Sequence, residues 1–299
     1  MAGTSEPMDA ERASPRRLTN AQQNWYRFKR NPTAVIGAVI VIICILIAVL
    51  APEIAPYPKD AGAVVNFRAR HLPPSFAHWF GTDDVGRDIL TRVMFGYRVS
   101  LLLVLAVLGT AVPFGSVLGL LAGYFGGWVE IVIMRITDIA LAIPPLVMAL
   151  AVAAVLDPSL VNSMFAVAVL WWTWHTRLVY SITRQLRTQE FVEAAETLGA
   201  SKFHILFREI LPNCMSPIIV KTSLDAGFVI LIGASLSFLG LGIKPPTPDL
   251  GTMVASGAAF LPDKWWESVM PGCAILFVAL GFNLLGDGLR DLYDVQEVR

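Results

Sequence analysis

The sequence predicts an all-α integral membrane protein with six transmembrane helices. Of its 299 residues, 55% are hydrophobic and only 15% are charged, whereas a soluble domain carries about 25% charged residues. Mean hydropathy is +0.62, so there are too few charges to cover a globule of this size. Six predominantly apolar runs reach the length of about 20 residues that a spanning helix needs. Continuous runs of this length exclude the alternating pattern of a membrane β-barrel.

The apolar runs define the predicted helices in chain order. The first follows Asn31-Pro32, an N-cap residue and then a proline at the first helical position. Its apolar core is too long for a cleavable signal peptide, and no small-residue cleavage site follows it. The six runs are Thr33–Ala51, Ser100–Ala122, Ile131–Leu156, Val161–Tyr180, Ile218–Leu241 and Val269–Gly286.

These helices divide the chain into a tail, a first helix, an external loop, a core and a second tail. The core contains five helices and a long polar cytoplasmic loop over residues 184–213. The expected boundaries are 1–30 for the cytoplasmic N-terminal tail, 31–51 for the first helix, 52–99 for the external loop, 100–290 for the core and 291–299 for the cytoplasmic C-terminal tail.

Lysine and arginine beside the spans predict the orientation, because they favour the cytoplasmic side. Arg27, Lys29 and Arg30 precede the first span and place the N-terminus in the cytoplasm. An even number of spans returns the C-terminus to the same side, and the basic loop after the fourth span is then cytoplasmic. The bias is modest, because the first external loop is basic as well, through Lys59, Arg68, Arg70, Arg87, Arg92 and Arg98.

Small residues recur in the second run as Gly115-x-x-x-Gly119-x-x-x-Gly123. This spacing lets two helices approach closely. Packing within the chain and dimerisation both explain it.

Tryptophans cluster where two of the spans meet the membrane surface. Three of them surround His175 at the end of the fourth run, and Trp265 and Trp266 precede the sixth. Clusters of this kind are typical of interfacial anchors. Between these spans, the small-residue stretch Leu250–Phe260 is expected to fold back as a short helix over the external mouth.

The most informative stretch is the cytoplasmic loop over residues 189–213, which predicts two short helices. The first covers about Glu190–Leu198, and Gly199 lies where a helix needs a left-handed residue after its end. Ser201 is an N-cap residue for the second helix, which Pro212 is expected to end. An apolar stripe with helical spacing marks one face of the second helix: Phe203, Leu206, Phe207 and Ile210.

An apolar helix face at the membrane surface fits a groove on another protein. It equally fits packing on the chain's own spans or insertion at the headgroup boundary. The residues alone leave these alternatives open.

The same loop resembles the EAA loop of permease subunits in binding-protein-dependent ABC importers. Glu209 stands where that loop usually has isoleucine, with Ile210 beside it, as in the peptide branch of the family. The residues that match the motif one by one are Glu193, Ala194, Ala195, Gly199, Leu211 and Pro212. In that family the loop is a coupling helix that sits in a cleft of the ATP-hydrolysing subunit, so the resemblance assigns this role to these residues and to the apolar stripe.

Other segments resemble the dipeptide, oligopeptide and nickel permeases, and within them the second of two paralogous permease subunits. They include Phe80-Gly81-Thr82-Asp83-Asp84-Val85-Gly86-Arg87-Asp88, the stretch from Ala122 to Trp128, and Pro245-Pro246-Thr247-Pro248. The resemblance implies a type I ABC-importer architecture in a bacterial inner membrane. It also implies a paralogous permease partner, two ATP-binding subunits that hold ATP and Mg²⁺, and an external solute-binding protein, while this chain holds no cofactor itself.

Ionisable residues within a span are costly and mark functional candidates. Arg135 and Asp138 are three residues apart at the start of the third run, where they are placed to pair on one helix face. Lys221 and Asp225 are four apart near the start of the fifth. Either these pairs line or gate a translocation path, or they are self-contained ion pairs between helices. In the third run, Pro144-Pro145 is expected to bend the helix.

Several functions are disfavoured by what the sequence lacks. The chain carries no net charge, which argues against nucleic acid as a partner. It has no G-x-x-x-x-G-K-[ST] motif to cradle nucleotide phosphates and no HExxH motif, and its three cysteines are far apart. An ion-coupled transporter and a membrane-embedded enzyme remain as alternatives, although neither an inverted repeat nor a catalytic set is evident.

Overall fold

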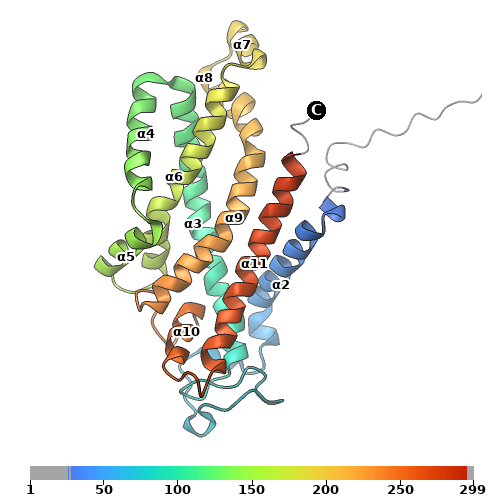
Figure 1. Cartoon of the computed structure of the whole chain (residues 1–299), viewed down its shortest axis with the longest axis vertical. Helices are drawn as coiled ribbons and strands as arrows, with labels where there is room; N and C mark the ends of the chain where they lie inside the picture. The colour runs from blue at the N-terminus through green and yellow to red at the C-terminus, as the bar shows by residue number, and fades with distance from the viewer. Residues whose placement is uncertain (1–25, 27, 295–299) are drawn as a thin grey trace, which may run out of the picture.

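The computed structural model describes Tyr26 and residues 28–294, which form helices joined by loops (Figure 1). Most of the predicted N-terminal tail, residues 1–25 and 27, and residues 295–299 of the predicted C-terminal tail lie outside the described residues. The all-α prediction is confirmed. The long helices are α2 (Pro32–Ile54), α3 (Ile89–Phe125), α4 (Gly127–Leu141), α5 (Pro145–Val155), α6 (Leu160–Leu186), α9 (Leu211–Phe238) and α11 (Trp266–Asp294).

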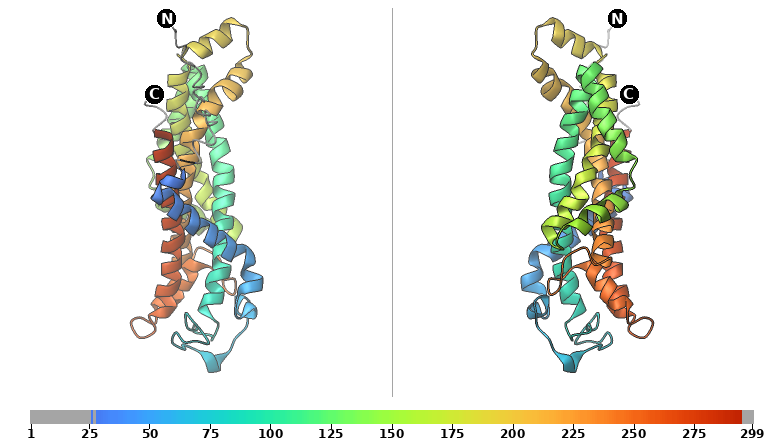
Figure 2. Two further views of the ribbon diagram at one scale, coloured as in Figure 1. Left: turned by 90° about the vertical axis from the view of Figure 1, so that its right-hand side faces the viewer. Right: turned by 90° about the vertical axis from the view of Figure 1, so that its left-hand side faces the viewer.

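Shorter elements lie at the two ends of the bundle. At one end are α7 (Glu190–Thr197), α8 (Lys202–His204) and the π-helical segment η3 (Ile205–Ile210). The other end carries the 3₁₀ turns η1 (Pro58–Ala61) and η2 (Phe67–Ala69) together with α10 (Leu250–Ala258). The start of α2 and the end of α11 point toward the same end as α7, opposite α10 (Figures 1 and 2).

Four helical stretches of the described chain are long and apolar enough to cross a membrane: α2, α3, the stretch Lys202–Phe238 and α11. The pair α4–α5 is a fifth candidate, bent by 85°. The remaining predicted span, the fourth, corresponds to α6, whose 27 residues are enough to cross a bilayer although it is more polar than the others. Six passes through the bundle are therefore compatible with the prediction.

The bend predicted at Pro144-Pro145 is present. Helix α4 ends at Leu141, and Pro144 adopts an extended ψ of 131° before α5 begins with Pro145. A residue before proline is pushed out of the helical region, and Pro145 fits the first position of the next helix. As a result α5 lies across the bundle instead of continuing along it (Figure 2).

Two helix starts are fixed by side-chain caps. Asn31 accepts a hydrogen bond from the Ala34 amide at 3.2 Å, as the sequence predicts for α2. At α3 the cap is Asp88, which accepts from the Thr91 amide at 2.8 Å. Because of this cap, α3 begins at Ile89 within the segment predicted as external loop, well before the apolar run that starts at Ser100.

The glycines at four-residue spacing in α3 pack against α6 of the same chain. A Cβ atom on Gly115 would lie 2.3 Å from the Trp172 carbonyl oxygen, and one on Gly119 would lie 2.6 Å from the Thr176 carbonyl oxygen. Gly123 meets the Thr183 side chain in the same way. The intrachain explanation of this pattern is therefore correct, and the two backbones are closer than any larger residue allows.

We predict that Gly119→Ala destabilises the protein, because the added methyl group would push against α6 backbone atoms. Overpacking of this kind costs about 1–3 kcal/mol, which should lower the midpoint of thermal unfolding in detergent by several degrees. The matched control is Gly109→Ala on the same helix, where a Cβ meets nothing within 4 Å. Equal midpoints for the two variants would contradict this account of the α3–α6 contact.

Candidate coupling site

Helix α7 and the segment after it form an elbow at one end of the bundle, here defined as residues 190–212. The turn is a Schellman motif: the Ala200 amide donates to the Ala195 carbonyl and the Gly199 amide to the Glu196 carbonyl, both at 3.0 Å. Gly199 has φ +78°, as predicted. Ser201 then caps α8 by accepting from the His204 amide at 3.3 Å, so both sequence signals of the elbow are confirmed.

One face of the elbow is built into the protein's own core. Val192, Ile205, Leu206 and Ile210 are at most 1% exposed. They form a cluster with apolar side chains of α3, α6 and α9, namely Leu120, Tyr124, Val179, Cys214 and Ile218. The elbow is therefore a rigid extension of the bundle.

A hydrogen bond and a cation–π contact hold the elbow against the end of α3. The Tyr124 hydroxyl donates to Glu196 Oε1 at 2.9 Å. The Lys202 ammonium lies 5.5 Å from the centre of the Phe125 ring, within the range of a cation–π contact. Glu193 and Glu196 are both exposed, but only the Glu196 carboxylate is tied to α3 by this hydrogen bond.

The other face of the elbow is exposed and partly apolar. Leu198 is 87% exposed, Phe203 73% and Phe207 41%. The two phenylalanine rings stack on each other with centroids 6.4 Å apart. Glu193 and Ala194 are exposed on the same loop, and Ala195 is half-buried at its inner side. Figure 2 shows α7 and α8 projecting beyond the bundle.

The prediction of one continuous apolar stripe was wrong. Phe203 and Phe207 are open to a partner, but Leu206 and Ile210 are buried against the chain's own helices. The sequence pattern missed Ile205, which shares the buried face. The reason is the wide turn of η3, in which the Leu211 amide donates to the Leu206 carbonyl five residues earlier, whereas the prediction assumed an α-helical period.

Pro212 does not end the helix, contrary to the prediction. The helical stretch runs without a break from Lys202 to Phe238, with Leu211 half-buried and Pro212 exposed. A proline inside a helix lacks an amide hydrogen and crowds the carbonyl of the preceding turn. The π turn just before Pro212 widens the backbone there, as π turns do where a regular helix is strained.

The first intramembrane pair differs from its prediction. Asp138 on α4 forms an ion pair with Arg177 on α6 and not with Arg135 on its own helix. The side chains of Asp138 and Arg177 remain about half exposed, and Arg135 is exposed as well. Tertiary packing decides the outcome, because α6 lies alongside α4 and brings Arg177 to the carboxylate.

The second pair, Lys221 with Asp225, forms as predicted on α9. Asp225 is only 2% exposed, and its second oxygen lies 3.8 Å from Nε2 of His175 on α6. His175 is fully buried and α6 continues past it to Leu186, so the prediction that it marks an interfacial anchor was wrong. Sequence reasoning missed His175 as a member of this cluster, because α6 and α9 are far apart along the chain.

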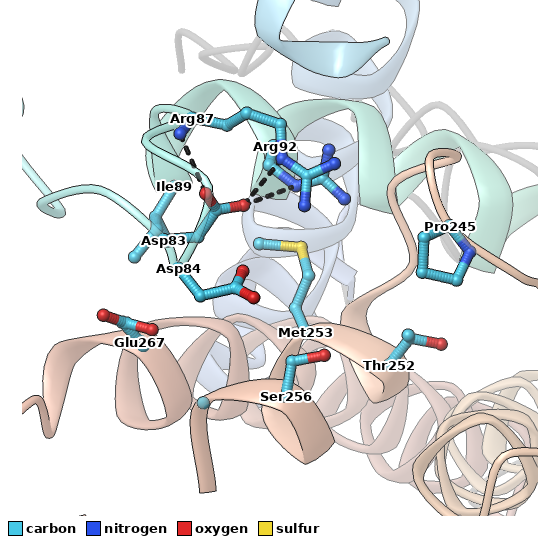
Figure 3. Close-up of a pocket in the computed structure, with 11 residues that line it drawn as sticks. Asp83, Asp84, Arg87, Ile89, Arg92, Pro245, Thr252, Met253, Ser256 and Glu267 are labelled. Carbon is cyan, nitrogen blue, oxygen red and sulfur yellow. Dashed lines mark hydrogen bonds and ion pairs between the residues drawn. The ribbon is translucent and has the colours of Figure 1, made fainter. Parts of the chain in front are cut away.

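At the end of the bundle opposite the elbow, Arg92 joins the loop before α3 to the loop before α10. Its guanidinium donates to the carbonyl oxygens of Asp60 at 3.1 Å and Pro246 at 3.3 Å, although the residue is only 4% exposed. Figure 3 shows the Asp83 carboxylate between Arg87 and Arg92, facing Met253 and Ser256 of α10 across a cavity of about 30 Å³, which is large enough for about one water molecule.

The same end of the bundle contains α10, the predicted short helix, over residues 250–258. Trp266, predicted as an interfacial anchor, is instead 6% exposed and donates to the Thr82 carbonyl at 3.4 Å. The neighbouring Glu267 Oε1 is hydrogen-bonded to His71 Nδ1 at 2.5 Å. The loops at this end are therefore held together and to α11 by buried polar contacts.

Protein-family comparison agrees with this geometry. Residues 115–295 match the family described as binding-protein-dependent transport system inner membrane component. Residues 19–74 match the N-terminal TM domain of oligopeptide transport permease C. Since the first match covers more than half of the chain, the protein belongs to this family of inner membrane components. It is a multi-pass membrane permease subunit.

Curated relatives are similar over nearly their whole length. The chain is 43% identical over 97% of its residues to the probable D,D-dipeptide transport system permease protein DdpC of Escherichia coli K12, covering 96% of that protein. It is 43% identical to the dipeptide transport system permease protein DppC of Alkalihalophilus pseudofirmus, with 90% and 87% covered. A third relative, the glutathione transport system permease protein GsiD of Pectobacterium atrosepticum, is 40% identical, with 90% and 89% covered.

We predict that Tyr124→Phe loosens the elbow by removing the hydrogen bond to Glu196. A net loss of about 0.5–1.5 kcal/mol should speed hydrogen exchange of the amides in residues 192–200 by about two- to tenfold. The control is Tyr180→Phe, whose hydroxyl donates to Glu130 on α4 and not to the elbow. Unchanged exchange in the first variant would show that this contact does not hold α7.

Proposed function

We propose that this chain is the permease subunit of an ATP-driven importer of dipeptides or related small solutes. The proposal is supported by the names of its relatives, which are permease proteins of dipeptide, D,D-dipeptide and glutathione transport systems. Substrate choice among these solutes rests largely with the external binding protein.

The observation that carries the coupling role is the two-sided elbow. Its inner face is buried in the bundle, so the elbow moves with α9, while its outer face presents Phe203, Phe207 and Leu198 without any partner in the described chain. A rigid projection with exposed aromatic side chains is the kind of surface that inserts into a groove on another protein. The partner is the ATP-hydrolysing subunit, with Glu193 and Ala194 at the rim of the contact.

The elbow end faces the cytoplasm in this proposal. Basic residues gather there, including Arg30, Arg187, Lys202 and Arg208, as the positive-inside rule requires. The external loops are basic as well, but Arg87 and Arg92 there share an ion pair with Asp83. With α2 starting and α11 ending at the elbow end, both termini are cytoplasmic and the protein lies in a bacterial inner membrane.

The working assembly contains further subunits. The chain pairs with a paralogous permease subunit, and two ATP-binding subunits bind ATP and Mg²⁺, because this sequence has no phosphate-binding loop. An external solute-binding protein delivers cargo to the cap formed by the external loops. No cofactor and no nucleic acid is held by this chain.

The intramembrane charges line the path between the two permease subunits. Arg135, Asp138 and Arg177 are exposed on α4 and α6, and charged groups exposed at membrane depth face water or another protein in preference to lipid. By contrast, the exposed side chains of α2 from Ile36 to Leu50 are aliphatic. ATP binding and hydrolysis move the elbow, and the path opens outward and then inward.

We predict that the double variant Phe203→Ala/Phe207→Ala assembles poorly with the ATP-binding subunits. Truncating a buried aromatic anchor costs about 2 kcal/mol or more, so peptide uptake in proteoliposomes should fall more than about tenfold, together with peptide-stimulated ATP hydrolysis. Phe165→Ala, on an exposed phenylalanine at the far end of α6, is the control. Normal uptake by the double variant, or uptake driven by an ion gradient with no ATP-binding subunit, would contradict the proposed coupling.

We predict a further difference between two replacements of Gly199. A Cβ atom there meets nothing within 4 Å, so only the left-handed φ restricts the choice of residue. Gly199→Val should lose uptake, because a β-branched residue is strained in that region, whereas Gly199→Asn should retain most of it. Similar activity of both variants would show that the shape of the turn does not matter for coupling.

A further inference from the structure

A cleft opens between α6, α9 and α11 in the half of the bundle nearest the elbow. Its volume is about 660 Å³, within the range of small-molecule sites. The walls are aliphatic, from residues such as Leu178, Ile182 and Leu224. The polar groups that line it are Gln185, Asn213, Ser216, Lys221, Arg290 and Tyr293.

Helix contacts place this cleft at the membrane surface on the elbow side. Gly286 of α11 packs against Leu224 in the cleft wall, and Gly288 packs against Ala34 in the first turn of α2. The deep end of the cleft is therefore level with the start of the apolar part of α2. Its polar side chains lie from that level outward, toward the elbow.

The charged side chains that line the cleft are both cationic. Among the described residues, two cationic side chains, Lys221 and Arg290, contribute to its lining, and no aspartate or glutamate does. The amides of Gln185 and Asn213 and the hydroxyls of Ser216 and Tyr293 add hydrogen-bond donors. Such a lining suits an anionic oxygen group better than an ammonium group.

Lys221 is held so that its ammonium faces the cleft. The Lys221 ammonium donates one hydrogen bond to Asp225 and lies 5.9 Å from the centre of the Trp174 ring. An ammonium has three donors, and the side chain is 31% exposed, whereas the side chain of Asp225 is 3% exposed. Asp225 is thus a positioning residue that holds the Lys221 ammonium, and His175 lies next to Asp225 on its other side.

We propose that this cleft binds the carboxylate of a small peptide-like solute, with the Lys221 ammonium as its counter-ion. The inference rests on the proposed importer function and adds the feature of the cargo that this chain recognises. The cleft is then the inner end of the path, reached after the cargo has left the external binding protein.

The experiment measures protection of a cysteine in the cleft. Ser216→Cys is introduced together with Cys273→Ser, because Cys273 is exposed while Cys44 and Cys214 are buried. The assembled transporter is placed in nanodiscs of phosphatidylcholine without nucleotide. The rate of modification by a charged thiol reagent is then followed on this chain by mass spectrometry, with dialanine or its C-terminal amide added. Ser181→Cys, exposed on α6 outside the cleft lining, is the control position.

We expect dialanine to slow modification of the cleft cysteine about threefold or more when most sites are filled, and the amide to have little effect. Lys221→Gln should raise the dialanine concentration needed for half-maximal protection about tenfold or more, because a charge-assisted hydrogen bond is lost, while Lys221→Arg keeps part of the affinity. The control cysteine should react at the same rate throughout.

Three outcomes would overturn the proposal. These are equal protection by dialanine and its amide, protection that survives Lys221→Gln, and no protection at all. Protection that appears only when anionic phospholipid is added would assign the cleft to lipid instead. Because the assay uses no nucleotide, it is independent of coupling: loss of ATP-driven uptake with intact protection would count against the proposed function and leave the carboxylate site standing.

Discussion

The close backbone contact between α3 and α6 is the constraint on which the rest of the structure depends. At Gly115, Gly119 and Gly123 the absence of side chains lets α6 approach until its carbonyl oxygens touch α3. This contact fixes the rotation of α6 about its axis, so that His175 faces α9 and Arg177 faces α4. Helix α6 leads into the elbow, so the contact between α3 and α6 also sets the position of the elbow at the end of the bundle.

The elbow combines two demands that a single amphipathic helix cannot meet. A lever must be fixed to the element that it moves, and it must also present a surface to its driver. Leu206 and Ile210 meet the first demand and Phe203 and Phe207 the second. A π turn makes the division possible, because it carries the chain past Pro212 into α9 without a break. In the proposed coupling, motion at the elbow is passed to the membrane as motion of one continuous helix.

Local signals predicted much of the fold, and tertiary contacts account for what they missed. The cap at Asn31, the bend at Pro144-Pro145 and the turn at Gly199 depend on neighbouring residues only, so the sequence contains the information. The partner of Asp138 is on another helix, and no spacing rule within α4 reveals it. Burial of His175 likewise depends on α9, and a tryptophan cluster read in isolation predicted an interface instead.

The buried cluster on α6 and α9 connects the elbow with the cleft. Asp225 lies on α9, which begins in the elbow, and His175 lies on α6, which packs against the glycines of α3. The 3.8 Å between them is longer than a hydrogen bond, and a buried carboxylate oxygen without a close donor is costly. A displacement of α9 relative to α6 must change this distance, and with it the position of the Lys221 ammonium that pairs with Asp225. In the proposed mechanism, this cluster links the elbow to the cleft through side-chain contacts between α6 and α9.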